Sequence, residues 1–319
     1  MRIGFIGVGG IAGNYLSSLK RLNQPVAAVC DVNAERAAQV AGEHQAASYG
    51  DHREMLAQEK LDAVFIGIPP GAHEGQVADA AGWGAAVFVA KPIGLDLDAV
   101  RRTRDVIQAK GVINQVGYMA RYSDITEKAR EITKDQPLGM GIGRFMCRMG
   151  AHPWWGKQAM CGGQMLEQST HVFDLLRYFL GEVAEVQAYG HKGLGDDIAD
   201  FEDSTVCNLR FANGAVGNVT STCIANAPDG FAMELTGRDF YLRFVMDTRL
   251  QGQINGEALN FEGQEAGYFR QVEQFLKAVE QHDQSLVRSS YADAARTLAV
   301  TLAANRSLET GQLEKVVEV

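Results

Sequence analysis

Glu167 and His171 stand four residues apart in a stretch with helical spacing, directly after the glycine pair Gly162 and Gly163. Side chains four residues apart lie on the same face of a helix, so the carboxylate and the imidazole would be neighbours. Histidine titrates near neutral pH, which suits an imidazole to accept a proton as a general base. An acid/base site is therefore one interpretation of this stretch.

The alternative is that the same stretch is an ordinary surface helix. With residues 164–180 treated as one helix of about 3.6 residues per turn, the polar side chains form a stripe and the apolar side chains lie opposite. The stripe consists of Glu167, His171, Asp174 and Tyr178, and the opposite face of Met165, Val172, Leu176 and Phe179. This pattern is typical of an amphipathic helix whose polar face meets water. Periodicity alone favours the surface helix.

A second constellation lies at the start of the chain, where a G-x-G-x-x-A motif separates an apolar strand from a helical pattern. In such a motif the first glycine makes a sharp turn, and the second lets backbone N–H groups approach a pyrophosphate. The start of the following helix favours the negative charge of the phosphates. We therefore predict that a dinucleotide binds to Gly7, Gly9, Gly10, Ile11 and Ala12.

Asp31 ends the second apolar strand, at about the 20-residue distance expected for the residue that binds the adenosine ribose. Its carboxylate would accept hydrogen bonds from a 2′-hydroxyl and repel a 2′-phosphate. The sequence therefore favours NAD over NADP as cofactor. Arg36, five residues further on, is also assigned to the cofactor site and keeps NADP open as the alternative.

The pattern of predicted strands and helices changes near residue 121. Before it, apolar strands at 2–7, 25–31, 61–68, 85–91 and 111–117 alternate with helical patterns, which predicts a doubly wound parallel sheet of the Rossmann type. After it, alternating strands predict an α+β domain with a mostly antiparallel sheet, including a type I′ hairpin at Asn213-Gly214. The expected domains are 1–121, which binds the dinucleotide, and 122–319, which binds substrate and mediates oligomerisation.

Composition limits the possible partners. The formal charge is −9, from 30 basic and 39 acidic residues, so no nucleic-acid partner is expected. The five cysteines are scattered and lack C-x-x-C spacing, which indicates reduced thiols instead of disulfides or a thiolate metal site. No apolar run reaches membrane-spanning length. We expect a cytoplasmic protein without a membrane partner.

Taken together, these motifs resemble the Gfo/Idh/MocA oxidoreductase family, which includes glucose–fructose oxidoreductase and inositol dehydrogenase. The resemblance preserves motif order over essentially the whole chain. It is carried by the glycine motif, Asp31, the helical stretch at 162–181, "IPPGAHEGQVADAA", "VFVAKPIGLDLDAV" and "VGYMARYS". It implies an NAD(P)-dependent enzyme that oxidises or reduces a sugar, a polyol or a derivative of these.

The resemblance also implies roles for individual residues. The family's E-K-P lysine, which touches cofactor and substrate hydroxyl, is Lys91, although the usual Glu is Ala90 here. The segment that lines the nicotinamide is represented by Ile68, Pro69 and His73. Without the resemblance, a surface lysine before a loop is the better interpretation of Lys91, and a solvent-exposed histidine at a helix start explains His73.

In the family's D-x-x-x-H motif the histidine is the catalytic base, which here is His171, with Glu167 in place of the usual Asp. A base is needed because hydride loss from a carbinol carbon leaves positive charge unless the hydroxyl proton departs. Lys91 would stabilise the developing alkoxide or relay the proton. Glu167 is assigned to substrate binding and to orientation of the imidazole. No metal is expected, since no second ligand set accompanies His171.

Further residues are assigned to substrate binding. His152, Trp154 and Trp155 lie in a predicted loop, and tryptophan rings stack on the apolar faces of sugars. An equally good interpretation makes the tryptophans anchors of the core or of an interface. By the resemblance, Tyr118 and Arg121 lie where the chain crosses between the domains and would line the same cleft.

The sequence therefore predicts an NAD-dependent sugar or polyol dehydrogenase that acts on a small carbohydrate and forms a homodimer or homotetramer. Two alternatives stay open. The first is a redox-assisted glycoside hydrolase or lyase, in which tightly bound NAD makes a transient keto sugar and is then regenerated. The second is a non-catalytic dinucleotide sensor that regulates a partner.

Overall fold

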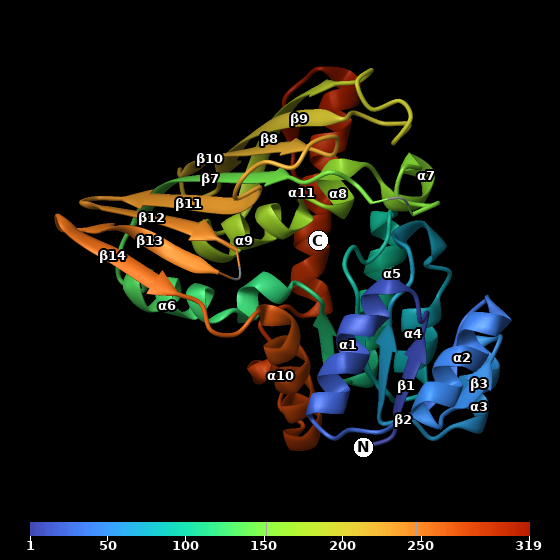
Figure 1. The fold of residues 1–319 in the computed structure, drawn as a ribbon. Coiled ribbons are helices and arrows are strands. Elements are labelled where there is room, and N and C mark those ends of the chain that lie inside the picture. Colours follow the sequence, from blue (N-terminus) through green and yellow to red (C-terminus); the bar gives the residue numbers. More distant parts are fainter. Residues whose placement is uncertain (151, 247) are drawn as a thin grey trace. The chain divides into compact units, whose positions relative to one another are not determined.

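The computed structural model describes residues 1–150, 152–246 and 248–319, which fold into two compact units (Figure 1). Unit 1 comprises Met1–Met119 and Tyr268–Ala294, and unit 2 comprises Ala120–Gly267 and Ala295–Val319. The assignment of residues 268–294 to the second domain is therefore corrected. The helix α10 (Gly267–Gln281) places Phe275 in the core of unit 1, where its ring lies 5.5 Å from that of Phe65 and 5.3 Å from that of Phe88.

Unit 1 is built on a six-stranded parallel sheet with the order β3-β2-β1-β4-β5-β6. Its strands are β1 (Ile3–Ile6), β2 (Val26–Cys30), β3 (Ala47–Tyr49), β4 (Ala63–Ile66), β5 (Ala86–Val89) and β6 (Asn114–Val116). Every residue of β1, β4 and β5 is buried, because helices cover both faces of a doubly wound sheet. The predicted Rossmann sheet is confirmed. The short edge strand β3 was missed because its residues are half-buried or exposed and show no apolar run.

The helices of unit 1 follow the pattern read from the sequence. They are α1 (Gly10–Arg21), α2 (Ala34–His44), α3 (His52–Gln58), α4 (Gln76–Gly82) and α5 (Leu97–Lys110), together with α10 and the 3₁₀ turns η1 (Pro70–Ala72) and η3 (Gln284–Leu286). Each of α2, α3 and α5 begins with an Asn or Asp whose side chain accepts a hydrogen bond from an N–H of the first turn. The start of α1 has no such side-chain cap.

Unit 2 is built on a nine-stranded, mostly antiparallel sheet with the order β14-β13-β12-β11-β7-β10-β9-β8-β15. Only its pair of β7 and β10 is parallel within the described residues. The strands are β7 (Leu138–Met146), β8 (Val183–His191), β9 (Ser204–Phe211), β10 (Val216–Thr222), β11 (Phe231–Gly237), β12 (Phe240–Val245), β13 (Arg249–Ile254), β14 (Glu257–Glu262) and β15 (Glu314–Lys315). The predicted fold class is therefore confirmed in both units.

The remaining helices include two whose residues are divided between the units. Those of unit 2 are α6 (Asp124–Thr133), α7 (Gln158–Cys161), α8 (Gln164–Glu167) and α9 (Thr170–Leu180), while η2 (Met119–Tyr122) and α11 (Tyr291–Thr310) cross from one unit to the other. Figure 1 shows α9 running along one face of the unit 2 sheet. Gly143 of β7 allows this close approach, since a Cβ atom there would lie 1.9 Å from Cγ1 of Val172 on α9.

The hairpin between β9 and β10 is present, but its turn differs from the expected type I′. That type needs positive φ at both central residues, whereas in this loop only Gly214 has it, with φ of +91°. Gly214 N–H donates to the carbonyl of Phe211, and the Asn213 side chain accepts from Ala215 N–H. Phe211 N–H donates to the carbonyl of Ala215, so residues 212–214 form a three-residue loop with glycine in the left-handed position, the next most common hairpin geometry.

The predicted single helix over 164–180 is in fact two helices, α8 and α9, separated by Gln168 and Ser169. Ser169 N–H donates to the carbonyl of Gln164, five residues earlier, which interrupts the regular ladder. The Ser169 hydroxyl lies 2.6 Å from that of Ser221 on β10, and this tertiary contact holds the break in place. Glu167 and His171 therefore belong to different helices.

Candidate functional site

The glycine loop after β1 fits a bound dinucleotide. Gly7 has φ of +80°, and a Cβ atom there would lie 2.6 Å from the carbonyl oxygen of Gly67, so only glycine makes this turn without strain. A Cβ atom on Gly9 or Gly10 would meet nothing within 4 Å, which leaves open space at the uncapped start of α1. Free N–H groups at a helix N-terminus are suited to a pyrophosphate.

Asp31, which follows β2, is joined to this loop by its carboxylate. One carboxylate oxygen accepts from Val8 N–H at 2.9 Å, and the other accepts from Asn33 N–H at 2.8 Å. Because a carboxylate has about four acceptor positions, two remain for the hydroxyls of a ribose. Arg36 donates through Nε to the carbonyl of Val8 at 2.9 Å and forms no ion pair with Asp31 in the described part of the chain. Both predicted cofactor residues thus contact the glycine loop.

Further residues assigned to the cofactor, and Tyr118, which is assigned to substrate binding, follow neighbouring parallel strands and therefore share the carboxyl edge of the sheet. Ile68 and Pro69 follow β4, Lys91 follows β5, and Tyr118 follows β6. Ligands of doubly wound sheets bind at this edge, beside the point where the strand order reverses between β1 and β4. Ala90, which stands where the family has Glu, is buried in the hydrophobic core and donates its N–H to the carbonyl of Ile66.

His73 lies just after η1 and is partly buried. Burial lowers the pKa of its imidazole to about 4, because desolvation disfavours the charged form. Its Nε2 atom is buried and has no hydrogen-bond partner among the described residues. At neutral pH this histidine is an uncharged ring, which corrects the interpretation of His73 as a solvent-exposed residue.

The polar stripe around His171 does not face water. Glu167, His171 and Asp174 are only 3%, 7% and 1% exposed, so the interpretation as a solvated helix face is wrong for these three residues. The imidazole of His171 lies 5.8 Å from the ring of Phe231, measured between ring centroids. Charged and titratable side chains are rarely buried unless partners stabilise them. Amphipathic packing alone therefore does not explain why these three side chains are buried.

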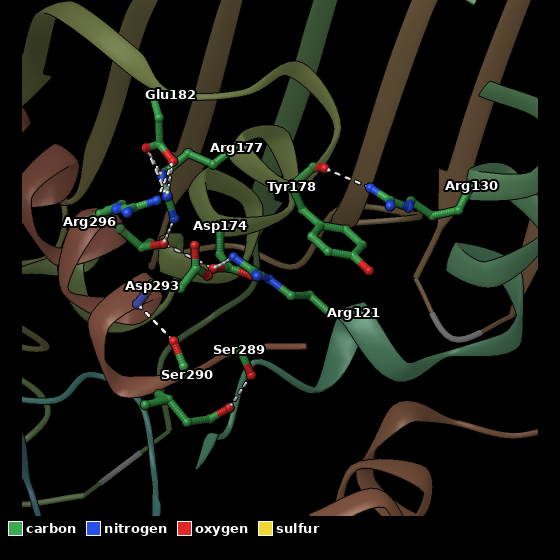
Figure 2. A network of polar contacts seen from close by, with 12 residues as sticks. Arg121, Arg130, Asp174, Arg177, Tyr178, Glu182, Ser289, Ser290, Asp293 and Arg296 are labelled. Atoms are coloured by element: carbon green, nitrogen blue, oxygen red, sulfur yellow. Dashed lines mark hydrogen bonds and ion pairs between the residues drawn. The ribbon is translucent and has the colours of Figure 1, made fainter. Parts of the chain in front are cut away.

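Part of that explanation is a buried ion pair between Arg121 and Asp174, whose side chains point at one another in Figure 2. Nε and Nη2 of Arg121 donate to the two carboxylate oxygens at 2.7 and 2.6 Å. Thr297 of α11 donates its hydroxyl to the same carboxylate at 2.9 Å, and the guanidinium lies 4.7 Å from the ring centroid of Tyr178. The described bonds of Arg121 hold α9, and its assignment to substrate binding stays a prediction.

The ion pair continues into a network that the sequence analysis missed (Figure 2). Arg177, one turn after Asp174, donates to the Thr297 hydroxyl at 2.7 Å and binds both carboxylate oxygens of Glu182. Arg296 reaches the same carboxylate at 3.3 Å. The network joins α9 to α11 and to the loop before β8. The spacing of Asp174 and Arg177 behind His171 was the available signal, but their partners are far away in the sequence.

The aromatic loop residues pack against one another. The ring centroid of Trp155 lies 4.7 Å from that of His152 and 5.8 Å from that of Trp154. Both tryptophans also border a small hydrophobic cluster that includes Phe201 and Cys161. This packing supports the alternative in which the tryptophans anchor the core, while His152 stays exposed; the assignment of all three residues to substrate binding stays a prediction.

No group of three or more His, Cys, Asp or Glu side chains in the described chain is placed to hold a metal ion. None of the helices within 1–150, 152–246 and 248–319 combines the length and the apolar character needed to span a membrane.

Comparison with known proteins decides the family. Residues 1–118 match the oxidoreductase family with an NAD-binding Rossmann fold, and residues 134–243 match the GFO/IDH/MocA C-terminal domain. The chain belongs to the Gfo/Idh/MocA oxidoreductase family. The resemblance read from the motifs is thereby confirmed, and so is the expectation of an NAD-type cofactor and of an oxidoreductase.

Relatives with assigned activities match most or all of this chain. The myo-inositol 2-dehydrogenase of Thermotoga maritima is 28% identical over 100% of this chain and 99% of its own length. The scyllo-inositol 2-dehydrogenase (NAD(+)) of Bacillus subtilis is 28% identical over 70% of this chain and 67% of its own length. Among solved structures, a levoglucosan dehydrogenase in complex with NADH matches with a TM-score of 0.90 and 20% identity, covering 100% of both chains. This last likeness concerns the fold.

Proposed function

We propose that this protein transfers hydride between NAD and a secondary hydroxyl group of a sugar, a polyol or a sugar derivative. Family membership supports the oxidoreductase activity, and the relatives named as inositol dehydrogenases support a polyhydroxylated substrate. The observation that carries the proposal is the open, uncapped glycine loop with Lys91 at the same sheet edge. A lysine there suits stabilisation of an oxyanion close to a bound nicotinamide.

In this proposal the chain supplies the proton chemistry. The nicotinamide ring, when bound, provides the hydride acceptor. His171 takes the proton of the substrate hydroxyl at an imidazole nitrogen, since an alcohol that loses hydride must also lose this proton. Lys91 stabilises the negative charge that develops on the same oxygen or relays the proton. Glu167 binds a further substrate hydroxyl and orients the imidazole.

The remaining assignments belong to the same proposal. Tyr118, His152, Trp154 and Trp155 contact the substrate, while Ile68, Pro69 and the neutral His73 line the nicotinamide. Asp31 binds the ribose hydroxyls and favours NAD over NADP, because its charge repels a 2′-phosphate. All five cysteines are free thiols, which suits a reducing cytoplasm.

We further propose that unit 2 binds the substrate and forms a homodimer or homotetramer through the open face of its sheet. The face opposite α9 exposes apolar side chains on neighbouring strands, which is unusual for a surface that stays in water. These are Met140 and Ile142 of β7, Tyr189 of β8, Val206 of β9, Val216 of β10 and Tyr241 of β12. In the sheet register Met140 pairs with Val216, and Val206 pairs with Tyr189, so the exposed apolar residues include two pairs of direct neighbours.

The function is tested by a screen of sugars, polyols and glycosides with NAD and NADP, which reads the absorbance of the reduced cofactor. On a substrate found in this way, we expect His171→Ala and Lys91→Ala each to lower kcat at least about a hundredfold. A His171→Ala variant with nearly unchanged kcat would remove histidine from the role of base. Consumption of a glycoside without any accumulation of NADH would instead identify the redox-assisted cleavage reaction.

A further inference from the structure

Four hydrogen bonds form a closed ring beside the glycine loop. Val8 N–H donates to Asp31 at 2.9 Å, and Asn33 N–H donates to the other oxygen of the same carboxylate at 2.8 Å. The side chain of Asn33 caps α2 by accepting from Arg36 N–H at 3.0 Å. Nε of Arg36 closes the ring on the carbonyl of Val8 at 2.9 Å. Both backbone polar groups of Val8 are therefore held by residues at the end of β2 and the start of α2.

The bond from Arg36 has a consequence for the next residue in the loop. The carbonyl of Val8 and the N–H of Gly9 belong to the same peptide group, which is planar and trans. In such a group the C=O and N–H bonds point in opposite directions, so a carbonyl held towards Arg36 turns the Gly9 N–H away from Arg36. Gly9 is the N-cap of α1, and no side chain lies within 4 Å of the position its Cβ would take.

We propose that Arg36 is a positioning residue for the dinucleotide, which sets the direction of the Gly9 N–H through the carbonyl of Val8. It does not act as a receptor for the 2′-phosphate of NADP. This inference rests on the dinucleotide site of the proposed function but not on the substrate or on the identity of the base. Its consequence is that Arg36 strengthens the binding of NADH and NADPH by the same factor.

The position of the donor nitrogen supports the positioning role of Arg36 over a role in binding the 2′-phosphate. The bond to Val8 uses Nε, the guanidinium nitrogen nearest the backbone, and it holds the Arg36 side chain against the glycine loop. The carboxylate of Asp31, which disfavours a 2′-phosphate, is fixed in the same ring through Val8 and Asn33. A residue that binds the 2′-phosphate would gain little affinity here, because the Asp31 carboxylate is held in place nearby and repels the phosphate.

Three substitutions separate the two roles. Glutamine carries its amide nitrogen on Cδ, the atom that carries Nε in arginine, so Arg36→Gln keeps a donor for the Val8 carbonyl and removes the charge. Lysine has a methylene group at that point, so Arg36→Lys keeps the charge and removes the donor. Arg36→Ala removes both. The measured quantity is the dissociation constant of NADH and of NADPH, read from the fluorescence of the reduced nicotinamide.

We expect Arg36→Ala and Arg36→Lys to weaken NADH binding by about threefold to tenfold, the usual effect of one intramolecular hydrogen bond. NADPH binding should fall by the same factor, and Arg36→Gln should stay within about twofold of the unchanged protein for both dinucleotides. Tm measured without dinucleotide identifies any variant that unfolds; if Arg36→Ala does, the comparison of Gln with Lys decides by itself.

A different pattern would overturn the proposal. If Arg36→Lys kept NADPH binding while Arg36→Gln lost it and NADH binding stayed constant, Arg36 would be a phosphate receptor. If NADH binding were unchanged in all three variants, the bond to Val8 would have no effect on the loop. Because the readout is dinucleotide binding, a failure to find a sugar substrate leaves the result intact.

Discussion

Arg121 and Asp174 form a two-point ion pair in which both side chains are almost completely buried, with N···O distances of 2.7 and 2.6 Å. Asp174 lies three residues after His171 on α9, and Arg121 lies in η2, close to the residue at which the chain enters unit 2. The pair therefore fixes the helix that carries the proposed base to a distant segment of the same unit. Thr297 adds a third fixed point from α11.

Removal of one partner should be costly, because the other charge would stay buried without its counter-charge. We expect Asp174→Asn and Arg121→Met each to lower the free energy of unfolding by about 3 kcal/mol. The double substitution Arg121→Met with Asp174→Leu should cost less than the two single losses combined. Urea denaturation of the single and double variants measures this coupling. Lys128→Ala, at an exposed ion pair, serves as the control and should change stability by less than about 0.5 kcal/mol.

Because His73 is neutral in the folded protein, we expect the stability of the protein to depend on pH. Its pKa is lowered to about 4 in the folded protein by burial, against an ordinary value of 6.5, so the unfolded chain binds the proton more readily between these two values. Stability should therefore fall as the pH decreases from about 6.5 to 4, by up to about 3 kcal/mol from this residue.

The test compares the urea midpoint of His73→Gln with that of the unchanged protein between pH 7 and pH 4.5. The variant should lose this part of the acid dependence. His282→Asn is the matched control, because His282 is exposed and asparagine tolerates its positive φ. Equal acid slopes in His73→Gln and in the unchanged protein would contradict a buried, neutral His73.

Asp31 should determine the preference between the two dinucleotides. Asp31→Asn removes the negative charge while leaving one oxygen that accepts from Val8 or Asn33, so the loop keeps part of its support. The ratio of the NADPH to the NADH dissociation constant should fall by about tenfold to a hundredfold, the effect of removing a charged acceptor. Fluorescence titration with both dinucleotides measures the ratio. An unchanged ratio would mean that Asp31 takes no part in cofactor discrimination.

The exposed face of the unit 2 sheet should mediate self-association. A lysine in the middle of an apolar interface would be buried without a partner, so Ile142→Lys should shift the protein from an oligomer to a monomer. Sedimentation velocity measures the change. Trp83→Lys replaces an apolar residue that is 63% exposed in unit 1, and it should leave the oligomer intact. If the wild-type protein is itself a monomer, this assembly is excluded.

Local features of the sequence predicted much of the site, and long-range contacts account for what was missed. The turn at Gly7 and the position of Asp31 depend on spacing within one β-α-β unit, so a motif is enough to find them. The break at Ser169 depends on Ser221, 52 residues away, and the pairing of Arg121 with Asp174 spans 53 residues. Helical periodicity contains no information about such partners.

The same reasoning explains the domain assignment of α10. Its amphipathic pattern shows that one face is buried, but not which core buries it. Only the packing of Phe275 among the aromatic rings of Phe65 and Phe88 assigns this helix to unit 1. The interpretation of the stripe at Glu167 and His171 as a solvent-exposed helix face failed for a related reason. A buried polar face and a solvent-exposed polar face give the same sequence pattern.

Gly143 offers a direct test of how closely α9 must approach the sheet. A Cβ atom there would lie 1.9 Å from Cγ1 of Val172, so Gly143→Ala must push α9, and His171 with it, away from β7. We expect a loss of about 2 kcal/mol in stability, typical of an overpacked core, measured by urea denaturation. Gly139→Ala on the same strand is the matched control, because a Cβ atom there meets nothing within 4 Å. Combining Gly143→Ala with Val172→Ala removes the clash and should recover part of the loss; equal stability of the two single glycine variants would show that the helix is free to shift.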